Sequence, residues 1–142
     1  MKGLSLVEVL LVVGIVAILI SLTLPLGLDF YKNQQLDTTV EEVVQVLRRT
    51  QLKAMSIEGD SSFGIYFGTG SPGQYSLFKG ESYATKTDEE VFDAPHDLAF
   101  SGVSEVTFSK LTGIPSVADS IVLTLGNKAK TITINSQGRI EW

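Results

Sequence analysis

The stretch KGLSLVEVLLVVGIVAILI, residues Lys2–Ile20, places a single carboxylate, Glu8, near the front of a long apolar run. No residue from Val9 to Leu28 is charged. As a helix, those residues reach about 30 Å, the thickness of the hydrocarbon core of a bilayer. We therefore expect residues 4–28 to form a transmembrane and assembly helix, followed by a small soluble part.

The apolar run admits simpler interpretations than an assembly helix. A secretory signal peptide has a shorter apolar core and a small-residue cleavage site, whereas this run is longer and Glu8 interrupts its start. A plain signal anchor fits better, because Lys2 before the run indicates a cytoplasmic N-terminus. A buried core helix fits least, because the rest of the chain is too small to enclose a helix that is apolar on every side. None of these accounts for Glu8, since one charge in hydrocarbon costs about 2.5–3.5 kcal/mol.

The residues around Glu8 are GLSLVE, Gly3–Glu8. They resemble the processing site of type IV prepilins and type II secretion pseudopilins. That resemblance implies a leader of residues 1–3, cleavage between Gly3 and Leu4, and N-methylation of the new Leu4 amine by a prepilin peptidase/methyltransferase. It also implies a type IV pilin-like fold.

The resemblance gives Glu8 a partner. In a filament of this family, Glu8 of one subunit would face the Leu4 amine of a neighbour. An intramembrane carboxylate needs such a partner, and other axial registers would leave a charge unpaired in a low dielectric. We expect Glu8 to specify assembly. Gly14 and Pro25 are the expected kink positions, because proline removes a backbone donor, although an isolated Gly14 is more often a packing position.

Residues 29–59 are expected to form an amphipathic helix that ends at Glu58, with Gly59 as its stop. Three- and four-residue steps predict its buried stripe: Leu36, Val40, Val43, Val44, Leu47 and Ala54. The basic residues Arg48, Arg49 and Lys53 are interpreted as a solvated face. The alternative is that they contact phosphate or the acids of a neighbour.

Residues 60–142 are expected to form a globular antiparallel β domain, which gives an α+β fold with the long helix packed on a small sheet. The predicted strands are Phe63–Phe67, Tyr75–Phe78, Leu98–Phe100, Glu105–Ser109, Ile121–Leu125, Thr131–Asn135 and Arg139–Trp142. Residues 68–73, GTGSPG, are expected to be a hairpin loop between the first two strands. The last three strands are expected to form a meander, with Ile132 and Ile134 on its buried face. Lys79–Pro95 is expected to be an irregular surface loop. Its acidic cluster Asp88-Glu89-Glu90 lacks the alternating carboxylates of a calcium loop, so calcium is only a minor alternative and we expect no cofactor.

The globular part resembles, more weakly, the GspH/FimT-like branch of minor pilins and pseudopilins, through the end of its helix and a late Gly138-Arg139-Ile140 segment. In FimT-like pilins, DNA contact has been linked to a Gly-Arg-x-Arg pattern. Here Glu141 replaces the second arginine. With a formal net charge of −5, one Arg139 beside a carboxylate attracts phosphate weakly, and nucleic acid is not an expected partner.

No motif of a catalytic site accompanies the one histidine, His96, and the chain has no cysteine. We expect a structural subunit and not an enzyme: a minor pilin or pseudopilin, or a major pilin, of a type IV pilus or a type II secretion system. Its expected partners are other subunits and an inner-membrane assembly platform. It would first cross the bacterial inner membrane, with its C-terminal domain outside the cytoplasm, and then join a periplasmic or extracellular filament. The alternatives are a DNA-uptake minor pilin and an uncleaved bitopic membrane protein with an external binding module.

Overall fold

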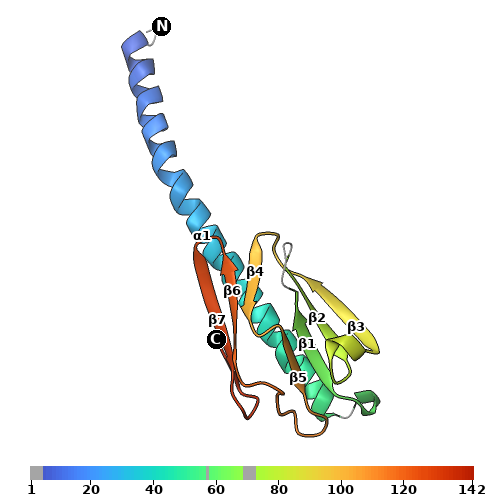
Figure 1. Cartoon of the computed structure of the whole chain (residues 1–142). Coiled ribbons are helices and arrows are strands. Elements are labelled where there is room, and N and C mark those ends of the chain that lie inside the picture. Colours follow the sequence, from blue (N-terminus) through green and yellow to red (C-terminus); the bar gives the residue numbers. More distant parts are fainter. Residues whose placement is uncertain (1–4, 57, 69–72) are drawn as a thin grey trace. The chain divides into compact units, whose positions relative to one another are not determined.

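The computed structural model describes residues 5–56, 58–68 and 73–142, with the backbone alone for residues 22–28 (Figure 1). The chain divides into two compact units, Met1–Gln34 and Gln35–Trp142. One helix, α1 (Leu6–Met55), contributes to both units. The predicted cleavage and methylation positions, Gly3 and Leu4, lie outside the described residues.

In the second unit, α1 buries the predicted apolar stripe. All six of its side chains are buried, and Val46 joins them. Two threonines also lie on this face, Thr39 and Thr50, and each hydroxyl donates to the carbonyl four residues earlier, at 2.9 and 2.7 Å. These bonds satisfy the buried hydroxyls, which would otherwise destabilise the core.

The helix ends three residues before the predicted position. It stops at Met55 instead of Glu58, and a short 3-10 helix, η1 (Glu58–Asp60), comes after it. Gly59 adopts a φ of +61° inside η1, a left-handed conformation that glycine takes without steric cost. The glycine therefore turns the chain as predicted, but it does so beyond the helix and not at its end.

The first sheet has the strand order β3-β2-β1-β5, and all its pairings are antiparallel. Its strands are β1 (Phe63–Phe67), β2 (Gln74–Lys79), β3 (Asp88–Asp93) and β5 (Glu105–Phe108). β1 coincides with its predicted range, and β2 and β5 differ from theirs by one residue at one or both ends. Residues 69–72 of the predicted β1–β2 hairpin loop lie outside the description.

Strand β3 overturns the prediction that Lys79–Pro95 is irregular throughout. It pairs with β2 along its whole length, from Gln74 opposite Asp93 to Lys79 opposite Asp88. Before it, residues 80–87 do form an irregular segment with a short 3-10 helix, η2 (Tyr83–Thr85), which Ser82 caps. The acidic residues suit an edge strand, because charged side chains on an open edge discourage pairing with another chain.

The second sheet has the order β4-β6-β7-β8 and is also antiparallel. Its strands are β4 (Leu98–Gly102), β6 (Ser120–Leu125), β7 (Lys128–Ile134) and β8 (Ile140–Glu141). The predicted meander of the last three strands is confirmed, as are the buried Ile132 and Ile134 on β7. The prediction of a single small sheet is wrong, because the described strands form two sheets. β5 pairs with β1 of the first sheet and not with β4, the strand before it.

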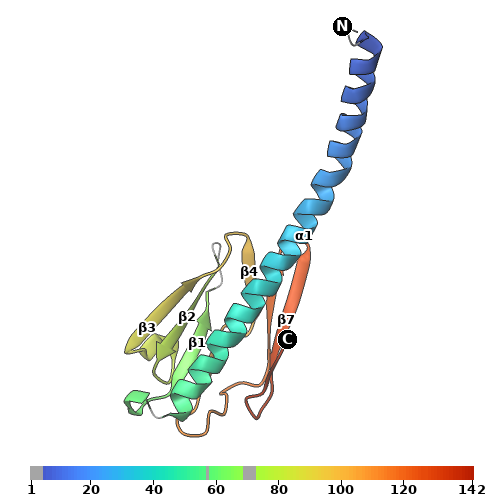
Figure 2. The same ribbon diagram turned by 180° about the vertical axis from the view of Figure 1, so that it is seen from behind.

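The core of the second unit lies between α1 and the two sheets, which Figure 2 shows from the side of the helix. Aromatic rings connect the sheets: Phe67 of β1 lies 5.3 Å from Phe100 of β4, and Tyr75 of β2 lies 5.8 Å from Phe100, between ring centroids. Such pairs add about 0.5–1.5 kcal/mol each beyond their burial. The predicted α+β fold, a long N-terminal helix on antiparallel sheets, is confirmed.

Candidate functional site

Glu8 lies in the first turn of α1 and is exposed. Its backbone N–H donates to the carbonyl of Ser5 at 3.0 Å and lies 3.4 Å from the Ser5 hydroxyl. Serine at this position satisfies a backbone donor that the helix start leaves open. A carboxylate in the first turn also interacts favourably with the helix dipole. The sequence thus places Glu8 where its charge supports the start of the helix.

The apolar side chains that follow Ser5 are open along the whole first part of α1. From Leu6 to Ile20, the large apolar residues are 47–77% exposed. A Cβ built on Gly14 would meet no atom within 4 Å. The described part of the first unit therefore presents a helix whose exposed side chains are apolar around its circumference, with Glu8 as the one acid between Leu6 and Ile20.

The membrane prediction for residues 4–28 includes positions that the structure leaves undescribed. Among the residues that the structure describes, no helical segment combines the length and the hydropathy that a membrane span requires. The side chains of residues 22–28, Pro25 among them, lie outside the description. The backbone of α1 passes through both predicted kink positions, Gly14 and Pro25, as one helix.

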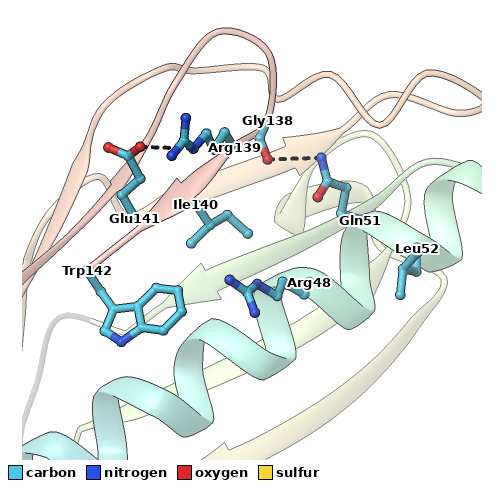
Figure 3. A pocket seen from close by; sticks show the side chains of 8 residues that line it. All are labelled: Arg48, Gln51, Leu52, Gly138, Arg139, Ile140, Glu141 and Trp142. Carbon is cyan, nitrogen blue, oxygen red and sulfur yellow. Dashed lines mark hydrogen bonds and ion pairs between the residues drawn. The ribbon is translucent and has the colours of Figure 1, made fainter.

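A second candidate site lies in the other unit, where α1 meets the C-terminal strand. Residues of α1 and the last five residues of the chain line an open cleft of about 670 Å³ (Figure 3). The side-chain amide of Gln51 donates to the carbonyls of Gly113 and Gly138, at 3.0 and 3.1 Å. Gln51 thus fixes two turns of the chain against the helix.

The basic residues of this cleft are already engaged within the chain. The Arg48 guanidinium lies 4.8 Å from the centroid of the Trp142 ring, a cation–π contact. The Nε of Arg139 lies 2.9 Å from a carboxylate oxygen of Glu141 (Figure 3). Glu141 therefore offsets the charge of Arg139 locally, which weakens any attraction for phosphate.

The sequence pointed to Arg139 but not to Arg48 or Gln51, which line the same cleft. Arg48 was expected to be a solvated helix residue, and Gln51 carried no prediction. Arg48 is indeed exposed, yet it lies over the terminal tryptophan. No local spacing signals these contacts, because they join positions that are far apart in the chain.

The acidic cluster on β3 forms contacts within the chain. The Glu89 carboxylate accepts from the Tyr83 hydroxyl at 2.8 Å and lies 2.7 Å from the Lys86 ammonium. The hydrogen bond from Lys86 is the main cause that lowers the pKa of Glu89. Glu90 pairs with Arg49 at 3.1 Å. In the described parts of the chain, no three histidine, cysteine, aspartate or glutamate residues gather as metal ligands.

His96, the one histidine of the chain, is exposed in the turn before β4. No catalytic constellation is brought together around it by the elements described above. The described residues instead form two surfaces that could contact another molecule. One is the apolar first part of α1 with its single acid, and the other is the cleft beside the charged second part of α1.

One known protein is similar to this chain over almost its whole length. It is the pilin-like protein PilA1 of Thermus thermophilus, at 29% identity over 154 aligned residues, covering 97% of this chain and 96% of the relative. No protein-family model and no solved structure matches. A pilin is a structural protein, which supports the expectation that this chain is not an enzyme. The GspH/FimT resemblance gains no support from this comparison. The chain is therefore similar, distantly and over almost its full length, to a pilin-like protein, and its own architecture is α+β with a long N-terminal helix.

Proposed function

We propose that the chain is a structural subunit of a type IV filament-family machine, assembled through the helix of residues 4–28. The observation that carries the proposal is the exposed apolar surface of α1 from Leu6 to Ile20, with Glu8 as its one acid. Fully burying one Leu, Ile or Val side chain contributes about 1.5–3 kcal/mol. So much open apolar surface therefore requires lipid, and later the helices of neighbouring subunits.

Processing would prepare this helix for assembly. A prepilin peptidase/methyltransferase would cleave after Gly3 and methylate the amine of Leu4. That amine would then pair with Glu8 of a neighbouring subunit, so that two charges that are costly in hydrocarbon satisfy each other. The similarity to a pilin-like protein supports this proposal, because it covers 97% of the chain.

The finer assignment is a minor pilin or pseudopilin on an inner-membrane assembly platform, with its globular domain outside the cytoplasm. The subunit would leave the inner membrane for a periplasmic or extracellular filament. A DNA-uptake role is not favoured, because Glu141 already pairs with Arg139.

The experiment that tests the proposal is mass spectrometry of the N-terminal peptide, from protein isolated from its own cells. We expect a peptide that begins at methylated Leu4. A Gly3→Val variant, in which the small residue at the cleavage position is lost, is the control and should retain residues 1–3. If the unaltered protein retains Met1-Lys2-Gly3 in cells with a working prepilin peptidase, the uncleaved bitopic alternative is correct and the filament subunit is wrong.

A further inference from the structure

The part of α1 in the second unit carries a regular stripe on its exposed side. Its members follow each other at steps of three and four residues, as in a heptad repeat, and all are exposed: Thr38, Glu41, Gln45, Arg48, Leu52 and Met55. Leu52 and Met55 are 64% and 45% exposed, so the C-terminal end of this set is apolar as well as open to solvent. We call this set the outer stripe.

The outer stripe forms a ridge between two open clefts. The cleft of about 670 Å³ lies toward β8, beside Arg48 and Leu52. The other, of about 690 Å³, lies toward β3 and is lined in part by Gln45 and Arg49. A helical ridge flanked by grooves is the shape that packs against a second helix. Figure 2 shows this side of α1 uncovered by either sheet.

Charge is segregated along this ridge. Glu41 and Glu42 lie toward its N-terminal end, and Arg48 and Arg49 lie toward its C-terminal end. Each acid precedes an arginine by seven residues, so the members of each pair point almost the same way from the helix. One helix cannot join them directly, because seven residues rise about 10 Å along its axis.

No charge partner within the described residues neutralises three of these four side chains. Glu41 and Glu42 form no ion pair with a basic side chain there, and Arg48 lies over the Trp142 ring without an acidic partner. Arg49 pairs with Glu90, but both side chains are about half exposed, at 51% and 45%. A pair so exposed to solvent contributes little to stability. Arg49 can therefore exchange Glu90 for another carboxylate at little cost.

The spacing selects one arrangement of two parallel helices. In register, Glu41 would face Glu41 and Arg48 would face Arg48, which is repulsive. A displacement of four residues would put Glu41 opposite the neutral Gln45. A displacement of eleven would put Glu41 opposite Leu52 and leave Glu42 as the one acid opposite a cation, Lys53. A displacement of seven residues brings Glu41 and Glu42 of one helix opposite Arg48 and Arg49 of the other.

We infer that the outer stripe binds α1 of a second copy of this chain, parallel and displaced by one heptad, about 10 Å. The inference rests on the proposed function, because subunits of one filament point the same way. Each copy would offer its arginines to one neighbour and its glutamates to the next, so the contact propagates instead of closing as a dimer. The subunit that receives Glu8 need not be the same neighbour, since a helical filament places several copies at different axial offsets.

Cysteine cross-linking tests the register directly, because the chain has no cysteine of its own. Thr38 and Gln45 are also seven residues apart on the outer stripe and are uncharged. In filaments of the Thr38→Cys/Gln45→Cys variant, oxidation should produce a ladder of multimers. The single variant Gln45→Cys should produce none. Dimers from Gln45→Cys alone would mean an in-register or antiparallel contact and would overturn the inference.

Charge reversal gives an independent test in cells. Glu41→Arg places arginine opposite arginine and should reduce filament number at least tenfold. The double variant Glu41→Arg/Arg48→Glu again places opposite charges across the contact, so the number of filaments should recover to within about twofold of the unaltered protein. Asp97→Arg, an equal change of charge at an exposed turn away from α1, is the matched control and should have no effect. Unimpaired assembly of Glu41→Arg would overturn the inference.

The two proposals fail in different ways. If the N-terminus is mature and methylated but no ladder of cross-linked multimers forms, the proposed register is wrong and the proposal of a filament subunit stands. A retained leader without a ladder overturns both. Each variant should be compared at equal abundance of the processed protein, so that loss of folding is not read as loss of contact.

Discussion

The side-chain amide of Gln51 donates to the backbone carbonyl of Gly138, 3.1 Å away, although 87 positions separate the two residues in the chain. Gly138 has a φ of +80°, and a Cβ at this position would lie 2.3 Å from the same amide nitrogen. The turn before β8 can therefore approach the helix only as glycine. This contact holds the C-terminal strand against α1.

Gln51→Ala should destabilise the second unit by about 1–3 kcal/mol, because the carbonyls of Gly113 and Gly138 lose their common donor. Denaturant unfolding of the full chain in detergent measures the loss. Gln45→Ala, on the exposed side of the same helix, is the matched control and should change the stability by less than about 0.5 kcal/mol. Equal effects would show that Gln51 contributes only helix propensity.

Leu47→Ala should cost about 2–5 kcal/mol of unfolding free energy, because Leu47 is fully buried and its removal leaves a cavity. Leu52→Ala makes the same chemical change on the same helix at a side chain that is 64% exposed. It should cost little in the isolated subunit. The same unfolding measurement compares the two variants, and a similar loss for both would contradict the assignment of the buried face.

Tyr75 makes the stability depend on alkaline pH. Burial, aided by the Glu42 charge, raises its pKa to about 12 in the folded chain, above its ordinary value of about 10. Below pH 10 both folded and unfolded chains keep the proton, so this contribution is fully present. Between about pH 10 and 12 only the unfolded chain loses the proton, so the stability falls as the pH rises.

Unfolding of the full chain at a series of alkaline pH values, compared with Tyr75→Phe, isolates this effect. The variant should lose less stability over the same interval than the unaltered protein. A fall of equal size in both would assign the alkaline sensitivity to other groups.

Glu8→Gln should leave processing intact and impair assembly. It keeps the size of the side chain but removes the charge that the proposal pairs with the Leu4 amine. Removing one partner of a pair in a low dielectric costs about 3–5 kcal/mol, so filament incorporation should fall at least tenfold. Electron microscopy measures the number of filaments, and the mass of the N-terminal peptide measures processing. Unchanged filament number and subunit incorporation would refute the assembly role of Glu8.

Arg139→Ala should change DNA retention by intact filaments less than about twofold, because Glu141 already offsets this charge. Retention at several salt concentrations is the measurement, with Glu141→Ala as the companion variant that frees the arginine. A large loss on Arg139→Ala, with filament number unchanged, would support the DNA-uptake alternative.

The helix and most strands were predictable because their signals are local. The stripe from Leu36 to Ala54 repeats at helical spacing, and Ile132 and Ile134 alternate with outward threonines. Such repeats indicate which side chains face a core. The GLSLVE segment is local too, but the assembly it implies involves other chains, so one subunit's structure does not test it.

Strand β3 and the split into two sheets were not predictable in the same way. β3 reads Asp-Glu-Glu-Val-Phe-Asp, without apolar alternation, because an edge strand needs only one neighbour and keeps much of its surface in water. Sheet membership depends on which strands pair over long distances, such as β1 with β5. The Gln51–Gly138 bond has the same origin, and no window along the sequence contains both partners.

The order of strands across the two sheets has a consequence for how the chain folds as it emerges. The chain leaves the first sheet after β3 to make β4, returns for β5, and leaves again for β6. When β5 has appeared, the first sheet can close, but β4 still has no partner, because its one neighbour is β6. Until residues 120–125 arrive, Phe100 and the open edge of β4 therefore depend on aromatic contacts with the first sheet and on α1 for protection.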